Sequence, residues 1–443
     1  MSATAARSVR MSWGRLPFPP PARELTVNSR SAALALEPAA SWQMSWLPYG
    51  NGRSYGDSCL NGGAGVIRTR GLDKLIAWDA QRGVLECEAG VLLQDIIGFA
   101  LPQGWFVPVT PGTQFVTVGG AIANDVHGKN HHAAGSFSRH VQSFELLRSN
   151  GERLPVDRDG QPSLFAATVG GLGLTGLLTR ATLQLKRVPG PTLLETKRRF
   201  RSFDEFFAVD ADLRATHEYT VAWIDCVAPA GERGRGIYGA ANHVEGPAMQ
   251  GAGRARRVPV DPPVSLVGPL SLRLFNAAYF RQPLAEGPRR VDYRPFFYPL
   301  DGVEEWNRIY GPRGFFQFQC VLPPEGARAS LPRLVELIAR DGSGSFLAVL
   351  KTFGELPSEG LLSFARAGTT LALDFANRGD ATRRLIAELE AIVIAAGGAL
   401  YPAKDALMSP EAFRASYPRW QAMHAVIDPA FSSQFWRRVT ADA

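Results

Sequence analysis

Lysine is scarce in this chain, and the scarcity has two consequences. It accounts for six of the 48 basic residues, so that 42 are arginines. The arginines are scattered along the sequence rather than gathered in one stripe, and we therefore expect no nucleic-acid partner despite the net charge of +7. Where arginine is the usual cation, a lysine indicates a position that favours a compact, titratable ammonium group. The six lysines are Lys74, Lys129, Lys186, Lys197, Lys351 and Lys404.

Cysteine is also rare, and the chain has no long apolar run. The four cysteines form neither a C-x-x-C pair nor a metal-ligand spacing, which predicts four reduced thiols. No apolar run approaches the roughly 18–20 residues that span a bilayer, so we do not expect an integral membrane protein. Prolines at 17 and 19–21 interrupt any signal-peptide core, and residues 1–30 are interpreted as a flexible leader. We expect a cytoplasmic or peripherally membrane-associated protein.

The length of 443 residues predicts two or three folding units, because one compact core rarely holds so many. Strand-like and helix-like stretches are interspersed, which indicates an α+β protein. The run Pro189-Gly190-Pro191 marks a boundary between two units. The expected strands are 83–90, 179–186, 219–227, 314–322 and 345–353, and the expected helices are 91–101, 331–340 and 381–396.

The stretch from residue 246 to residue 295 differs in composition from its surroundings. It combines Gly, Pro and Ala with five arginines and has an apolar centre at 266–280. One interpretation is a long, inert surface insertion. The other is a mobile cover or interfacial segment, whose arginines meet phosphate while its apolar residues meet lipid. The arginines are Arg254, Arg256, Arg257, Arg289 and Arg290.

Residues 49–57 form the first of two glycine-rich constellations. Their sequence, Tyr-Gly-Asn-Gly-Arg-Ser-Tyr-Gly-Asp, has three glycines within seven positions. Glycines let successive backbone N–H groups converge on one point, which makes an anion-binding nest, and Arg53 adds a positive charge. A tight surface loop is the alternative interpretation of the same pattern.

The second constellation covers residues 111–132. Small residues between 117 and 124 permit a long, flat ligand to approach the backbone closely. The polar residues that follow are too dense for an ordinary structural loop. His127 and His131 have the i,i+4 spacing of metal ligands, but Gly128 lies between them and no third ligand is evident, so we predict no metal site. The polar cluster consists of His127, Lys129, Asn130 and His131.

Residues 171–176 match the dinucleotide fingerprint G-x-G-x-x-G, but their context excludes a Rossmann fold. The fingerprint has to follow a strand and open a helix. Here residues 164–168 are expected to be helical, and residues 177–186 alternate like a strand. The chain also lacks a G-x-S-x-G elbow and a G-x-x-x-x-G-K-[ST] loop, so α/β-hydrolases and P-loop enzymes have no support.

Several motifs together resemble the FAD-binding fold of the vanillyl-alcohol-oxidase type. A more specific subset resembles the decaprenylphosphoryl-ribose oxidase family, the flavin half of an epimerase system for cell-wall arabinan precursors. The similarity extends from about residue 46 to about residue 429 and is patchy between 190 and 292. The motifs of the fold are 50–57, 111–113 and 118–123, and the more specific ones are 127–137, 167–176 and 401–405.

The resemblance implies a two-subdomain FAD-binding fold joined to a substrate domain that is built on an antiparallel sheet with helices. Residues 1–191 would form the FAD-binding domain and residues 192–398 the substrate-binding domain, with 246–295 as a mobile insertion. Residues 399–443 would return to the FAD-binding domain. Members that hold FAD covalently often have a histidine where Tyr55 stands, so we expect non-covalent FAD.

The resemblance also implies the cofactor contacts. FAD would lie extended between the two subdomains, with its diphosphate against the loop at 50–58. The expected cofactor-binding residues are Tyr49, Gly50, Asn51, Gly52, Arg53, Ser54, Tyr55, Gly56, Asp57, Ser58, Gly112, Thr117, Val118, Gly119, Gly120, Asn124, Val126, His127, Leu178 and Tyr401.

The implied chemistry is oxidation of a secondary sugar alcohol, in which a hydride moves from carbon to flavin N5 while the hydroxyl loses its proton. Lys404 would assist this proton loss, either as a buried ammonium group or as a base whose pKa desolvation has lowered. Tyr55 and His127 complete the expected catalytic set. The expected substrate residues are Lys129, Gln317, Gln319, Val349, Lys351, Phe353, Thr370, Ala372 and Lys404.

Three positions depart from the family pattern. Ala372 stands where the family has a flavin-proximal cysteine, Thr370 where it has an asparagine, and Asn124 where a close relative has a cysteine. These changes concern the substrate pocket more than the flavin.

The resemblance therefore predicts an FAD-dependent oxidoreductase that acts on a secondary alcohol of a sugar, with a polyprenyl-phosphoryl pentose as the expected substrate. The expected partner is a short-chain NAD(P)H reductase that completes an epimerisation, and peripheral membrane contact is expected as well. The alternative within enzymes is an FAD oxidase or dehydrogenase for another sugar, a polyol or an aromatic alcohol. The alternative outside enzymes is a basic nucleic-acid or membrane-surface binding protein with a vestigial flavin fold.

Overall fold

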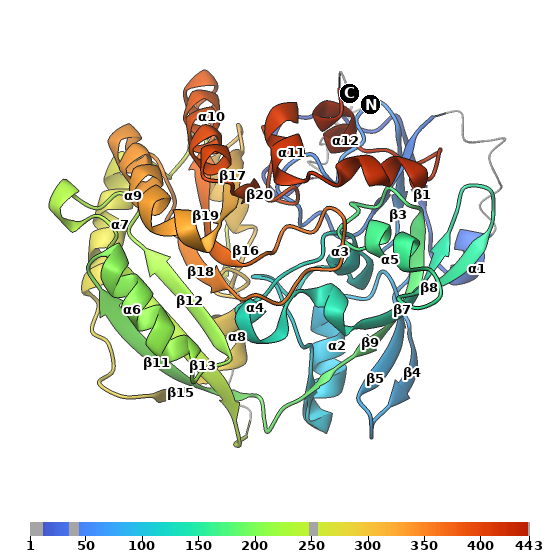
Figure 1. The fold of residues 1–443 in the computed structure, drawn as a ribbon, viewed down its shortest axis with the longest axis horizontal. Helices are drawn as coiled ribbons and strands as arrows, with labels where there is room; N and C mark the ends of the chain where they lie inside the picture. Colours follow the sequence, from blue (N-terminus) through green and yellow to red (C-terminus); the bar gives the residue numbers. More distant parts are fainter. Residues whose placement is uncertain (1–11, 35–43, 248–255, 442–443) are drawn as a thin grey trace, which may run out of the picture.

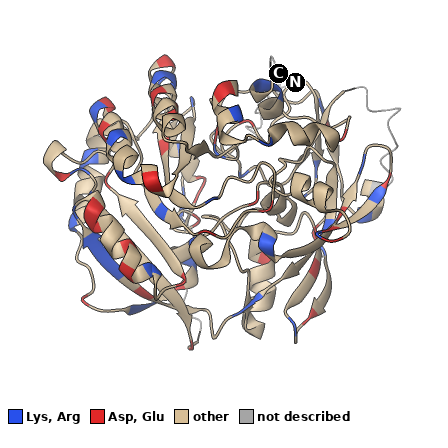
Figure 2. Ribbon diagram, viewed as in Figure 1, with Lys and Arg blue, Asp and Glu red and all other residues tan. Residues whose placement is uncertain are grey.

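The computed structural model describes residues 12–34, 44–247 and 256–441. Two large antiparallel sheets dominate it, one of five strands on the right of Figure 1 and one of eight strands on the left. Helices are interspersed with the strands along the chain. The α+β class predicted from the sequence is therefore confirmed. Charges of both signs are spread over both halves (Figure 2).

The five-stranded sheet has the order β4-β5-β9-β7-β8. Along β5 half-exposed residues alternate with buried ones, and Leu85 and Cys87 lie inside. Helix α2 buries residues at the i, i+3, i+4 and i+7 positions, which is the spacing of one helical face. The bounds are β4 (Leu75–Asp79), β5 (Val84–Glu88), β7 (Val141–Leu147), β8 (Arg153–Asp157), β9 (Leu177–Gln184), α2 (Leu93–Ala100), α3 (Val118–Ala123) and α5 (Pro162–Thr168).

The eight-stranded sheet has the order β15-β11-β13-β12-β18-β19-β17-β20 and is antiparallel throughout. Helices α6, α9 and α10 pack against one of its faces, which leaves the other face for the cavity described below. The bounds are β11 (Thr192–Phe200), β12 (Tyr219–Ile224), β13 (Gly236–Val244), β15 (Arg289–Asp292), β17 (Phe315–Leu322), β18 (Val349–Phe353), β19 (Gly368–Ala376), β20 (Ala399–Leu400), α6 (Phe203–Arg214), α9 (Pro324–Asp341) and α10 (Asp380–Ala395).

The sequence signals at the helix ends explain where these helices start and stop. Ser202 accepts a hydrogen bond from the Glu205 N–H and so caps α6. Helix α9 starts at a proline and ends at Gly342, which adopts a left-handed φ of 72° that disfavours other residues. No helix within the described ranges is both long and apolar enough to cross a membrane.

The stretch 246–295, expected to be a mobile insertion, contains regular elements where the structure describes it. Helix α7 (Pro269–Arg281) buries Leu272, Asn276 and Phe280. Strand β15 pairs with β11 at the edge of the eight-stranded sheet, and α8 (Tyr293–Phe297) follows it. Residues 248–255, with Arg254, lie outside the described residues. That the stretch covers the cavity stays a prediction.

The structure differs from the expectation that residues 1–30 form a flexible leader. Residues 1–11 lie outside the described residues, but the chain from Ser12 onward is packed. Strand β1 (Arg23–Thr26) pairs in parallel with β3 (Gly65–Arg68), which also pairs with β2 (Trp46–Tyr49). Leu16 is buried in the main core. The proline-rich composition of this segment did not indicate such an apolar contact.

The C-terminal residues hold the glycine-rich loop in place from behind. Helix α12 (Gln434–Val439) carries Arg438, whose guanidinium group donates two hydrogen bonds of 2.8 Å to the carboxylate of Asp57. The same guanidinium group donates to Asp405 at 2.9 Å. Helix α11 (Pro410–Ser416) lies between these contacts in the chain. Through these hydrogen bonds Arg438 joins helix α12 to two segments near the cavity, those of Asp57 and Asp405.

Candidate active site

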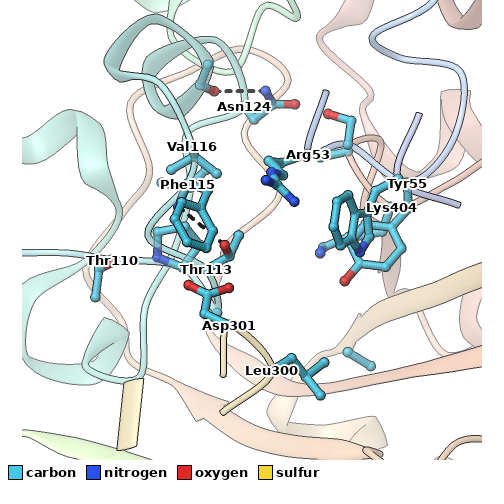
Figure 3. A pocket seen from close by; sticks show the side chains of 18 of the residues that line it. Arg53, Tyr55, Thr110, Thr113, Phe115, Val116, Asn124, Leu300, Asp301 and Lys404 are labelled. Carbon is cyan, nitrogen blue, oxygen red and sulfur yellow. Dashed lines mark hydrogen bonds between the residues drawn. The ribbon is translucent and has the colours of Figure 1, made fainter. Parts of the chain in front are cut away.

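A cavity of about 910 Å³ is lined by loops of the five-stranded half and by one face of the eight-stranded sheet (Figure 3). Its volume lies in the range of cofactor and ligand sites. The expected site residues that line it are Gly50, Asn51, Gly52, Arg53, Ser54, Tyr55, Ser58, Gly112, Thr117, Gly119, Gly120, Asn124, Val126, His127, Lys129, Leu178, Gln317, Gln319, Val349, Lys351, Ala372, Tyr401 and Lys404.

Six expected residues do not line the cavity. Asp57 is fully buried against Arg438, and a Cβ on Gly56 would lie 1.5 Å from the Asp405 carbonyl oxygen, so both pack behind the loop. Thr370 is buried and accepts a hydrogen bond from Gln319. These residues support the cavity wall rather than face a ligand. The six are Tyr49, Gly56, Asp57, Val118, Phe353 and Thr370.

The loop after β2 has the features of an anion site. Gly52 adopts a φ of 60°, which turns the loop in a conformation that favours glycine. In the part of the chain that the structure describes, the N–H groups of residues 51–54 donate no hydrogen bond. The Arg53 guanidinium group lies 4.1 Å from the Trp13 ring centre, and its Nε has no partner among the described residues. The loop therefore suits the diphosphate of FAD.

Helix α3 starts at the cavity. The Thr117 side chain accepts a hydrogen bond from the Gly120 N–H, which caps the first turn. A Cβ on Gly50 would lie 2.5 Å from Thr117 Oγ1, so only glycine allows the loop to approach the helix this closely. The Asn124 amide donates to the Gly120 carbonyl at 2.8 Å, as Figure 3 shows. Small residues thus leave room for a flat ligand along α3.

Asp125 fixes the loop between α3 and the histidines. It is fully buried and accepts hydrogen bonds from Ser136 Oγ at 2.9 Å and from the Ser138 N–H at 3.0 Å. Ser363 Oγ, from a distant part of the chain, donates to it at 2.6 Å. The Tyr401 hydroxyl donates to the Asn124 carbonyl at 3.1 Å. The position of His127 is therefore set by contacts from both halves of the molecule.

His127 and Gln319 join the two sides of the cavity. Their Nε2 atoms lie 3.0 Å apart. Burial, followed by the charge of Lys351, lowers the pKa of His127 well below its usual value, so the imidazole is neutral. Because Gln319 Nε2 can only donate, His127 Nε2 accepts and the ring proton is assigned to Nδ1. The Gln319 amide also donates to Thr370 Oγ1 at 3.2 Å.

Asp374, four residues after Thr370 on β19, is buried, and its neighbour of opposite charge, Lys404, is half-buried. Burial lowers the pKa of Lys404 from its usual 10.5 and raises that of Asp374, while each partner's charge opposes the shift of the other. Gln317 Nε2 donates to Asp374 Oδ1 at 2.7 Å. This leaves Gln317 Oε1 buried and without a partner in the described chain. The two groups influence each other's pKa through their charges, and Gln317 offers an acceptor to a ligand hydroxyl.

The sequence did not single out several residues that line the cavity. Trp13 falls in the expected leader, and Asp301 stands in a loop without a motif. Residues 172, 173 and 176, by contrast, belong to the fingerprint-like stretch that the sequence did single out; it follows helix α5 and precedes strand β9, whose first residue, 177, also lines the cavity. That order is the one expected from the sequence, and it shows glycines that serve the cavity without a Rossmann unit. Asp301, which accepts a hydrogen bond from the Gln114 N–H at 2.9 Å, left no sequence signal.

Comparison with known proteins assigns the fold of this site. The chain matches the FAD binding domain family over residues 28–157. It is 36% identical over 407 residues to decaprenylphosphoryl-beta-D-ribose oxidase from Mycolicibacterium smegmatis, with 88% of each chain covered. It is 37% identical over 372 residues to an uncharacterized protein in the mprA 5' region of Streptomyces coelicolor, which covers 79% of this chain and 100% of that protein.

A more distant similarity is confined to part of the chain. Cytokinin dehydrogenase 2 from Arabidopsis thaliana is 29% identical over 143 residues, which are 32% of this chain and 28% of that protein. Together with the family match, these similarities confirm the FAD-binding fold and the FAD-dependent oxidoreductase activity predicted from the sequence motifs.

Proposed function

Because the chain belongs to the decaprenylphosphoryl-β-D-ribose oxidase family of FAD-dependent oxidoreductases, we propose that it oxidises a secondary hydroxyl of a polyprenyl-phosphoryl pentose. One observation carries the proposal. A single cavity combines an anion-binding loop suited to FAD with an ammonium group, a neighbouring carboxylate and neutral hydrogen-bonding groups suited to a sugar. FAD, when bound, accepts the hydride at N5. The protein's own groups hold the sugar and take its proton.

Lys404 is the group that takes the proton from the reacting hydroxyl. Its lowered pKa supports a role as base rather than as a permanent cation, because more of the neutral amine exists at a given pH. The carboxylate of Asp374 then stabilises the ammonium group that forms. Asp374 acts through its charge on Lys404 and is therefore a positioning residue.

The neutral groups around this pair orient the sugar. Gln317 Oε1 accepts a hydrogen bond from a sugar hydroxyl, since its amide nitrogen is engaged by Asp374. The neutral His127 and the amide of Gln319 form a second polar edge. Uncharged partners suit hydroxyl groups, because they donate and accept without adding a charge that a sugar cannot neutralise.

FAD is bound without a covalent link in this proposal. Tyr55 occupies the position at which a linking histidine would be expected, and a phenol is not the usual flavin attachment point. Cys59 also lines the cavity, but burial raises the pKa of its thiol to about 12, so the nucleophilic thiolate does not accumulate near neutral pH.

The experiment that tests the substrate is anaerobic reduction of the bound flavin by a panel of alcohols. Farnesyl-phosphoryl ribose, ribose, a polyol and an aromatic alcohol are each mixed with holoenzyme, and the loss of flavin absorbance is followed. The proposal expects fast reduction by the lipid-phosphoryl pentose alone. Preferential reduction by another alcohol would replace this function with that of a different FAD oxidase or dehydrogenase.

The product of this reaction requires a second enzyme. Oxidation of one hydroxyl leaves a ketone, and returning it to an alcohol of opposite configuration takes a hydride donor. We therefore propose a short-chain NAD(P)H-dependent reductase as the functional partner. Epimerisation of the pentose by the two purified proteins together, and by neither alone, is the expected result.

The exposed face of α7 is proposed to rest on a lipid surface. Leu270 and Leu274 are 71% and 65% exposed, and the exposed Arg273 and Arg281 on the same helix would meet anionic headgroups. The face is continuous with the cavity through Tyr279, which lines the cavity and stacks on Phe275 at 5.9 Å. Co-sedimentation with anionic vesicles, lost in Leu270→Asp/Leu274→Asp, is the expected behaviour.

A further inference from the structure

Four of the six lysines in this arginine-rich chain line the one cavity described above. Lys404 belongs to the proton-handling pair. The other three, Lys129, Lys197 and Lys351, come from separate segments of the chain, and of them Lys351 acts on that pair through its charge. Because arginine is the usual cation elsewhere in this sequence, three lysines in one cavity wall indicate a separate function that favours an ammonium group.

The three lysines surround a trough in the eight-stranded sheet, defined by Lys129, Lys197, Val221, Gly239 and Lys351. On the cavity face, Lys197 of β11 pairs with Gly239 of β13, which pairs with Val221 of β12. The adjacent pair Ala222 and Leu350 puts Lys351 of β18 next in this row. The floor between the two lysines therefore consists of a glycine and a valine, which leaves space for a ligand.

Lys129 approaches the trough from the other side. The Lys129 carbonyl accepts a hydrogen bond of 2.8 Å from the Thr220 N–H, which holds its loop over β12. Its ammonium group donates to the Phe296 carbonyl and lies 4.7 Å from the Phe296 ring centre. A cation held by a carbonyl and a ring keeps further donors for a ligand, since an ammonium group has three.

The trough carries an excess of positive charge. Neither Lys129 nor Lys351 forms a salt bridge in the described chain. Glu195 is the carboxylate next to Lys197, at 3.2 Å, and Arg289 engages the same carboxylate at 3.1 Å. One carboxylate thus serves two cations. Burial and, after it, the charge of Lys351 lower the pKa of Lys129 to about 7, and a bound anion would relieve the repulsion between the two lysines.

We propose that Lys129, Lys197 and Lys351 bind the phosphodiester group of the substrate. The identity of the natural ligand rests on the proposed function, whereas the anion site itself rests on the trough. Lys351 stands opposite Thr370, four residues along β19 from Asp374, or about 13 Å of strand. The long side chain of Lys351 spans part of that distance, so a pentose fits between phosphate and base.

Three of the arginines of 246–295, which the sequence offered as phosphate contacts, have partners within the protein. Arg257 pairs with Glu305, Arg289 pairs with Glu195, and Arg290 donates to the Glu245 carbonyl. Beyond the trough, the cavity-lining Trp223 contacts Tyr279 with ring centres 4.7 Å apart. An apolar chain attached to the phosphate could leave the cavity along these rings toward α7.

The test is calorimetric titration of the holoenzyme with three probes: farnesyl phosphate, farnesol and inorganic phosphate. Farnesyl phosphate should bind, and farnesol should bind at least tenfold more weakly. Lys351→Met should lower the affinity for farnesyl phosphate by about tenfold or more, the scale of a charge-assisted hydrogen bond. Lys197→Met, at the rim, should act in the same direction. Lys351→Arg should retain part of the affinity, and the exposed Lys74→Met is the matched control. Tight binding of inorganic phosphate alone would place a free anion here and overturn the assignment to the substrate.

Equal binding of farnesol and farnesyl phosphate, or unchanged affinity in both lysine variants, would also overturn the proposal. The calorimetric result does not depend on turnover. Lysine-dependent binding of farnesyl phosphate without oxidation of any lipid-phosphoryl pentose would contradict the proposed function and support this site. Oxidation of the lipid-phosphoryl pentose with a KM that neither lysine variant changes would support the function and contradict this site.

Discussion

The ammonium group of Lys404 lies 3.8 Å from the centre of the Tyr55 ring, and the two side chains are neighbours in Figure 3. The backbone joins them as well, since the Tyr55 N–H donates to the Ala403 carbonyl at 2.9 Å. The loop suited to FAD and the loop that carries the proposed base are therefore one unit. A change in either should alter the position of the other.

Replacement of Lys404 should separate catalysis from cofactor binding. Lys404→Ala is expected to retain FAD and to slow substrate-driven flavin reduction by roughly two to four orders of magnitude, the scale of general base assistance. Lys404→Arg should be impaired as well, because arginine keeps the charge but does not release its proton. Stopped-flow absorbance measures both. Full activity in Lys404→Arg would mean that the group acts as a cation and not as a base.

The pH dependence of flavin reduction should report the Lys404–Asp374 pair. The neutral amine is the active form, so the rate should rise with pH, and burial places this rise below the usual lysine value of 10.5. Asp374→Asn should move the rise to lower pH, since the lost carboxylate is the charge that raises the pKa of Lys404. A shift to higher pH in Asp374→Asn would contradict the pairing.

The sequence predicted the local elements and much of the cavity, because both depend on short patterns. The glycine loop at 50–54 and the small residues at 117–124 follow from residue size, and both segments line the cavity. Contacts between distant segments left no such pattern. Nothing in the chain indicated that Arg438 would pair with Asp57, or that Lys197 would share a trough with Lys351.

Loss of Arg438 should destabilise the protein and weaken FAD retention. Asp57 is fully buried, so Arg438→Leu leaves its charge without its bidentate partner, at a cost of about 3–5 kcal/mol. Thermal unfolding and the flavin content after gel filtration measure the two effects. The exposed Arg419→Leu is the control. Equal melting temperatures for the two variants would show that the clamp contributes little.

Thiol reagents should leave the enzyme active. Burial raises the pKa of Cys59, Cys87 and Cys226 to about 12, and that of Cys320 as well, so little thiolate exists at pH 8. Ala372 pairs with Gln319 and Val349, in the row that lines the cavity. Ala372→Cys should therefore become sensitive to iodoacetamide in a substrate-protected manner. Rapid inactivation of the unmodified protein would contradict the inertness of its own thiols.

The flavin should be released when the protein is unfolded. Acid precipitation of the holoenzyme is expected to leave a yellow supernatant, because Tyr55 stands at the usual linkage position and the Cys59 thiol is protonated. Mass spectrometry of the supernatant should give the mass of FAD. Yellow colour that stays with the polypeptide would show a covalent link.

Anaerobic flavin reduction shows whether the cavity oxidises a lipid-linked, phosphate-bearing pentose. Holoenzyme is mixed with farnesyl-phosphoryl ribose or with ribose at equal concentration, and flavin absorbance is followed. We expect rapid bleaching by farnesyl-phosphoryl ribose, slow or no bleaching by ribose, and loss of the fast reaction in Lys404→Ala. Equal bleaching by both sugars, or none by farnesyl-phosphoryl ribose, would contradict this function.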